Sequence, residues 1–266
     1  MRCTQTNRSG FTLVEVLVIS PIIILFIGAF IALLVNLTGE SLVVREKNAI
    51  IHDTQSTLDS IQSDISQSTS FLSNTPTLTS PQGSNDSTAA FTDVTSGQND
   101  ALIMQLPATN AAPTNAARTL IYVGTPGSCD SKNALQTYTV VYFVGDDTET
   151  PASGDVALFK RIILPTTSSC ATIWQRGSCR ATVMTAGNIA TCMAADERLI
   201  GGASAITLEV KYYNYVSGVS TAGRDNSATT ATDASAAITV SEQVAGETVS
   251  HTASVRATSL NTQVTQ

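Results

Sequence analysis

The feature that most constrains the fold is an uncharged, mostly apolar run of twenty residues from Val16 to Val35. A helix of this length spans about 30 Å, the thickness of the hydrocarbon core of a bilayer. Arg2 and Arg8 precede the run, and the first charge after it is the acidic Glu40. The positive-inside rule therefore predicts a cytoplasmic N-terminus, with the rest of the chain outside.

A single carboxylate, Glu15, lies directly before this run. An ionisable residue costs roughly 2.5–3.5 kcal/mol at the centre of a membrane helix, and such residues are by default functional and paired. An ordinary cleaved signal sequence fits poorly, because the run is too long and no A-x-A site follows it. A plain signal anchor fits the length. In that case Glu15 merely snorkels to the interface and has no further role.

Residues 10–15 read Gly-Phe-Thr-Leu-Val-Glu and follow a short basic leader. This combination resembles the recognition motif of type IV prepilins and pseudopilins. In that family a prepilin peptidase cuts on the cytoplasmic side, here between Gly10 and Phe11, and the apolar helix is kept. The new N-terminus is usually methylated. The resemblance implies that Glu15 pairs with the Phe11 amine of a neighbouring subunit, since the two positions lie about 6 Å apart along a helix. Pro21 is expected to kink or loosen the helix locally.

Beyond Gly39 the apolar pattern becomes one-sided. Residues at spacings near three, four and seven define one helical face. They are Val43, Ile50, Thr54, Leu58, Ile61, Ile65 and Leu72. We expect one helix from about Phe11 to about Phe71, near 90 Å long, whose apolar stripe receives a β-sheet. A free coiled coil is less consistent with the pattern, which lacks a sustained heptad.

Seven later segments carry the β-branched and aromatic residues that strands prefer. They are 101–106, 119–124, 137–144, 156–164, 205–216, 238–244 and 247–258. Two hairpins are predicted, one across the polar turn at 145–155 and one across Ala245-Gly246. Residues 217–237 are predicted to form a surface loop. The fold class is thus α+β, a long N-terminal helix packed on an antiparallel sheet. The expected divisions are a leader at 1–10, a transmembrane and filament-core helix at 11–37, an amphipathic extension at 38–72, a flexible connector at 73–100 and an antiparallel β domain at 101–266.

Five cysteines are present. Cleavage after Gly10 would remove Cys3 with the leader. The remaining four are Cys129, Cys170, Cys179 and Cys192. On the oxidising side of a membrane they predict two disulfides, with three possible connectivities. The alternative is a set of unpaired buried thiols.

Composition argues against several classes of function. The formal net charge of −7 disfavours broad nucleic-acid binding. Only two histidines occur, and the chain has no G-x-S-x-G, P-loop or H-E-x-x-H motif, so no catalytic residues, cofactor or metal are expected. Asp146, Asp147 and Glu149 form an acidic turn whose carboxylates suit Ca²⁺, although a solvated hairpin turn is the preferred interpretation.

The order of the later elements resembles the W-type minor pilins and the J-type minor pseudopilins of type II secretion. The matching segments are 138–142, 158–161, 206–213 and 255–256. This resemblance implies a structural minor pilin whose partners are the prepilin peptidase, other pilin subunits and the inner-membrane assembly platform. The chain would cross the cytoplasmic membrane once, with its C-terminal part outside, and then enter a filament at the bacterial surface. The alternatives are a pseudopilin of a secretion or competence machine and a membrane-anchored adhesin or binding module that never polymerises.

Overall fold

The structure is a computed structural model. It describes residues 13–72, 101–125, 127, 129, 133–147, 154–181, 192–216, 219–223 and 231–259, without the side chains of 214–223. Gly10, Phe11, Glu149 and the expected connector at 73–100 therefore lie outside the described residues.

One long helix, α1, runs from Leu13 to Gln67 and continues through Pro21. Its 55 residues extend about 80 Å. The second half buries one face, as the spacing of apolar residues predicts. The buried residues are Ile50, Thr54, Thr57, Leu58, Ile61 and Ile65.

The helix ends four residues before its expected end at Phe71. The amide and the hydroxyl of Ser68 both donate to Ile65 O, at 3.1 and 2.7 Å, and so satisfy a carbonyl of the last turn. The amide of Thr69 then donates to Gln105 O at 2.8 Å. Phe71 consequently lies in a short strand, where strand pairing replaces the helical hydrogen bonds.

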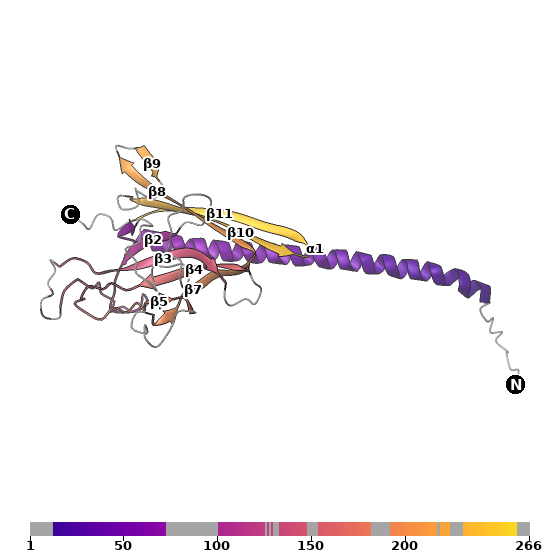
Figure 1. The fold of residues 1–266 in the computed structure, drawn as a ribbon, viewed down its shortest axis with the longest axis horizontal. Coiled ribbons are helices and arrows are strands. Elements are labelled where there is room, and N and C mark those ends of the chain that lie inside the picture. Colours follow the sequence, from indigo (N-terminus) through magenta and orange to yellow (C-terminus); the bar gives the residue numbers. More distant parts are fainter. Residues whose placement is uncertain are drawn as a thin grey trace, which may run out of the picture.

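Two antiparallel sheets pack against the buried face of α1, rather than the single sheet that the sequence predicts (Figure 1). In the first, the spatial order is β1 (Ser70–Leu72), β2 (Leu102–Pro107), β3 (Thr137–Asp146), β4 (Val156–Ile163) and β7 (Glu197–Ala203). In the second, the order is β11 (Glu247–Thr258), β10 (Asp233–Val244), β8 (Ala205–Val216) and β9 (Val219–Gly223). A small parallel pair consists of β5 (Ser178–Cys179) and β6 (Ala194–Ala195).

Both predicted hairpins are present. Strands β3 and β4 pair from Thr139 opposite Ile163 to Asp146 opposite Val156. Strands β10 and β11 are joined by Ala245 and Gly246, whose φ angles are +52° and +83°. Two central residues with positive φ define the type I′ turn, which matches the twist of the flanking strands.

One strand prediction and one loop prediction differ from the structure. Residues 119–124 form only isolated bridges, such as Thr109 with Leu120. The predicted loop at 217–237 contains β9 and the first residues of β10. Ala234 and Ala236 of β10 are buried opposite Tyr212 and Val210 of β8, so pairing on both sides overrides the weak strand preference of alanine.

The first sheet is buried on both faces. Its inner face shares the main core with α1 and the second sheet. Its outer face carries a smaller core that includes Ile103, Val141, Phe143, Ala157 and Phe159. Burial on both faces explains why residues 140–144 form a continuous apolar run instead of alternating with polar residues.

Candidate functional site

The first half of α1 is an exposed apolar surface that projects away from both sheets (Figure 1). Twenty large apolar side chains between Leu13 and Val44 are exposed, including Phe26 at 74%. The helix is long and apolar enough to cross a membrane, by length and composition. Contiguous apolar surface of this extent marks contact with lipid or with other protein chains.

Glu15 lies in the first turn of α1, on this exposed surface. It is the only charged residue between Leu13 and Gly39. A carboxylate in the first turn is favourably placed with respect to the helix dipole. Its predicted partner, the amine of Phe11, lies outside the described residues, so that pairing stays a prediction.

A polar cluster that the sequence did not reveal joins α1 to the first sheet. Asp64 Oδ2 accepts a hydrogen bond of 2.6 Å from the Tyr142 hydroxyl and lies 2.7 Å from Lys160 Nζ. Burial, together with the charge of Asp64, raises the pKa of Tyr142. The same two causes, partly opposed by Arg118, raise the pKa of Tyr138 to about 12. The only feature of the sequence that could have indicated this cluster is that Asp64 directly precedes Ile65, a residue of the apolar stripe.

The four cysteines beyond residue 100 form two disulfides, as predicted. The pairs are Cys129–Cys170 and Cys179–Cys192, one of the three connectivities left open by the sequence. The amide of Cys170 also donates to Tyr122 O at 2.9 Å, so the first bond joins two loops that already share a backbone contact.

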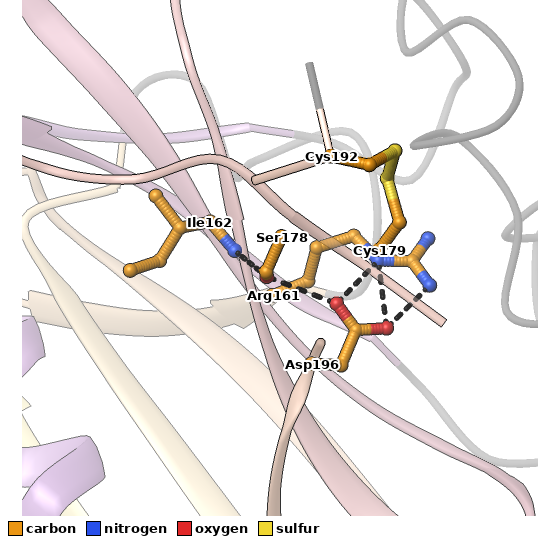
Figure 2. The surroundings of a disulfide bond; sticks show 6 residues. All are labelled: Arg161, Ile162, Ser178, Cys179, Cys192 and Asp196. Atoms are coloured by element: carbon orange, nitrogen blue, oxygen red, sulfur yellow. Dashed lines mark hydrogen bonds and ion pairs between the residues drawn. A yellow bond between two sulfur atoms is a disulfide. The ribbon is translucent and has the colours of Figure 1, made fainter. Parts of the chain in front are cut away.

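The second disulfide lies beside a buried ion pair (Figure 2). Arg161 of β4 donates from Nε and Nη2 to the carboxylate of Asp196, and these side chains are 0% and 2% exposed. Ser178 Oγ donates to Asp196 Oδ1 at 3.0 Å and accepts from the amide of Ile162 at 2.9 Å. Neither charged residue carries a sequence signal that separates it from a surface residue.

The predicted solvated acidic turn is wrong for Asp147. Its side chain has no exposed surface and accepts hydrogen bonds from the Arg198 guanidinium and from the amide of Gly202 at 2.7 Å. The guanidinium of Arg180 donates to the backbone oxygen of Asp146. The carboxylate of Asp147 is therefore balanced by an arginine. Within the described ranges, no three His, Cys, Asp or Glu side chains are grouped so that they could hold a metal ion.

A scan against protein-family models, a search of curated proteins and a search of solved structures each found no match. No relative therefore assigns a role to the exposed helix or to the polar clusters. The described part of the chain combines a helix whose apolar first half, Leu13 to Gly39, carries one carboxylate with a cross-linked β body. Such a helix is suited to anchoring the chain in a membrane.

Proposed function

We propose that the protein is a structural subunit of a type IV pilus, of the minor pilin type, which is cut after Gly10 and assembled through α1. The observation that carries this proposal is the contrast between the two halves of α1. One half buries one face against two sheets, and the other exposes twenty large apolar side chains. The prepilin-like residues 10–15 lie at the start of the exposed half.

The exposed half requires an apolar environment. Each large apolar side chain gains about 1.5–3 kcal/mol on burial, so twenty of them disfavour exposure to water by tens of kcal/mol. A bilayer covers this surface before assembly, and equivalent helices of other subunits cover it in a filament. The two environments are similarly apolar, which allows the helix to move from one to the other.

Glu15 gives the packing of these helices its register. A carboxylate surrounded by apolar groups is strongly destabilising unless a cation neutralises it. Cleavage after Gly10 creates such a cation at Phe11, about one helical turn away. The charge can be satisfied by the amine of a neighbouring subunit when the two helices pack with a defined axial offset.

The disulfides support an external position for the β body. Disulfides form and persist in oxidising compartments, and both lie far beyond the apolar half of α1. The basic leader before that half favours the opposite side, the cytoplasm. The chain then crosses the membrane once before assembly.

Mass spectrometry of the mature N-terminus tests the processing step. The expected mature chain begins at Phe11 and carries a methyl group on its amine. A mature chain that still begins at Met1, or that has lost the residues up to Val35, would overturn the proposal.

A charge substitution tests the assembly step. We expect Glu15→Gln to leave the membrane-bound amount unchanged and to lower the filament fraction about tenfold or more, since each 1.4 kcal/mol of lost contact energy is a factor of ten. Glu40→Gln, which removes a carboxylate outside the apolar run, is the matched control and should assemble normally. Equal behaviour of the two variants would favour an anchor that does not polymerise.

A further inference from the structure

The ion pair between Arg161 and Asp196 is the most deeply buried charge pair among the described residues, with 0% and 2% of the two side chains exposed. A guanidinium in such a position is strongly destabilising once its carboxylate is removed. Asp196 therefore stabilises the buried position of Arg161.

Asp196, which pairs with Arg161, and Ser178, which donates to Asp196, belong to two segments that the Cys179–Cys192 bond joins (Figure 2). Ser178 directly precedes Cys179, and Asp196 follows Cys192 by four residues. The two segments also pair through β5 and β6, and the amide of Asp196 donates to Cys179 O at 2.8 Å. The covalent bond and the hydrogen bonds thus hold the same two segments together.

These segments lie over the outer core of the first sheet. The rings of Phe143 and Phe159 stack with centroids 5.7 Å apart. The guanidinium of Arg161 lies 4.8 Å from the centroid of Phe143, and that of Arg180, next to Cys179, lies 3.9 Å from the centroid of Phe159. Two cations therefore lie against the aromatic pair: Arg161, from β4 itself and paired with Asp196, and Arg180, from the segment next to Cys179.

We propose that the Cys179–Cys192 disulfide is a redox latch that holds Asp196 against buried Arg161, so that reduction opens the layer over Phe143 and Phe159. A dithiol reductant breaks the S–S bond, supplies two electrons and two protons to give two thiols, and itself becomes a disulfide. The segment carrying Asp196 then separates from the segment carrying Ser178. Exchange with a disulfide oxidant reverses these steps and closes the layer. This latch does not depend on whether the chain forms filaments.

Hydrogen–deuterium exchange of the full chain in detergent tests the latch. In Cys179→Ala/Cys192→Ala we expect peptides covering β4 and β6 to exchange about tenfold faster or more, because a local opening that becomes 1.4 kcal/mol easier is ten times more populated. The matched control is Cys129→Ala/Cys170→Ala, which removes the other disulfide and should leave these peptides unchanged. Equal exchange of β4 and β6 in the two variants would overturn the proposal.

A variant without the ion pair distinguishes the proposed latch from a disulfide that only cross-links the chain. Removing a disulfide that closes a short loop should lower Tm by about 6–12 °C in a chain of this size. This loss of the cross-link remains with Arg161→Met/Asp196→Leu, which removes both charges, so we expect a fall of that size in the uncharged chain and a larger fall in the charged chain, where the ion pair is disrupted as well. Equal falls in the charged and uncharged backgrounds would mean that the disulfide and the ion pair are independent. If the cysteine variant does not fold, the folded wild-type chain is reduced with a dithiol and the same peptides are followed by exchange.

Discussion

Tyr142 and Asp64 are joined by a hydrogen bond of 2.6 Å that links the first sheet to the last turns of α1. Tyr142 is fully buried, so its hydroxyl requires an acceptor within the protein. Lys160 completes the cluster with an ion pair of 2.7 Å to the same carboxylate oxygen. Asp64 thus fixes the position of the helix on the sheet through two different partners.

Removing this carboxylate should cost far more than removing an exposed one. We expect Asp64→Ala to lower the free energy of unfolding by about 2–4 kcal/mol, because it deprives a buried hydroxyl and a largely buried ammonium of their acceptor. Denaturation of the chain in detergent, followed by circular dichroism, measures this change. Asp59→Ala, on the exposed face of the same helix, should change the value by about 0.5 kcal/mol or less. Similar losses in the two variants would contradict the role of Asp64.

Stability should fall at alkaline pH because of buried tyrosines. The pKa of Tyr138 is raised from 10.0 to about 12, and that of Tyr142 is raised further, in both cases first by burial and then by Asp64. The folded state thus retains protons that the unfolded state releases. The stabilisation that the two neutral tyrosines give to the folded state is complete below pH 10 and is lost as the pH rises from about 10 through 12. The free energy of unfolding falls over this range by about 1.4 kcal/mol per pH unit for each tyrosine.

Unfolding midpoints between pH 8 and pH 12 check this dependence. Tyr138→Phe should flatten the decline between pH 10 and pH 12, since one of the retained protons is then absent. Phenolate absorbance from both tyrosines near pH 10, in protein that is still folded, would refute the prediction.

Gly201 leaves room for the guanidinium of Arg198, which pairs with Asp147. A Cβ atom at Gly201 would lie 2.0 Å from Cζ of Arg198, so the guanidinium would have to leave its position. Because Asp147 has no exposed side-chain surface, we expect Gly201→Ala to lower the free energy of unfolding by about 1–3 kcal/mol.

A double substitution identifies the cause of that loss. Arg198→Met removes the same ion pair directly. Adding Gly201→Ala to Arg198→Met should cost little more than Arg198→Met alone, because the displaced partner is already absent. Denaturant midpoints of the three variants measure the coupling, and additive losses would show that Gly201 acts by another route.

The turn between β10 and β11 offers a stabilising change. Ala245 has a φ angle of +52°, a left-handed conformation that costs an ordinary L-residue roughly 1–2 kcal/mol. Asparagine followed by glycine is the preferred pair for this turn type. We expect Ala245→Asn to raise the free energy of unfolding by about 0.5–1 kcal/mol and Ala245→Val to lower it. An asparagine variant no more stable than the valine variant would argue against backbone strain at this position.

The elements that depend on local periodicity could be predicted from the sequence. The stripe from Ile50 to Ile65 follows the helical repeat and is buried as predicted. The strands at 205–216 and 247–258 have the predicted bounds, because alternation and the Ala245-Gly246 turn specify them locally. The pairing of all four cysteines beyond residue 100 also followed from their number, although not their connectivity.

The features that depend on partners distant in the sequence could not be predicted. Asp64, Arg161 and Asp196 are charged residues of the kind usually found on a protein surface. They are buried only because separate segments pack over them. The start of β10 is rich in alanine and serine, which have little strand preference, so it forms a strand only because β8 and β11 flank it.

The placement of α1 between two sheets also affects how the molecule responds to tension. Strands β10 and β11 lie alongside the helix (Figure 1), and the buried residues from Ile50 to Ile65 extend over about 20 Å of its axis. A pull on the N-terminal end would act along that axis and shear these contacts together, instead of peeling them apart one by one. Resistance to extraction of the helix is then set by the rate of unfolding under force, which many simultaneous contacts keep slow.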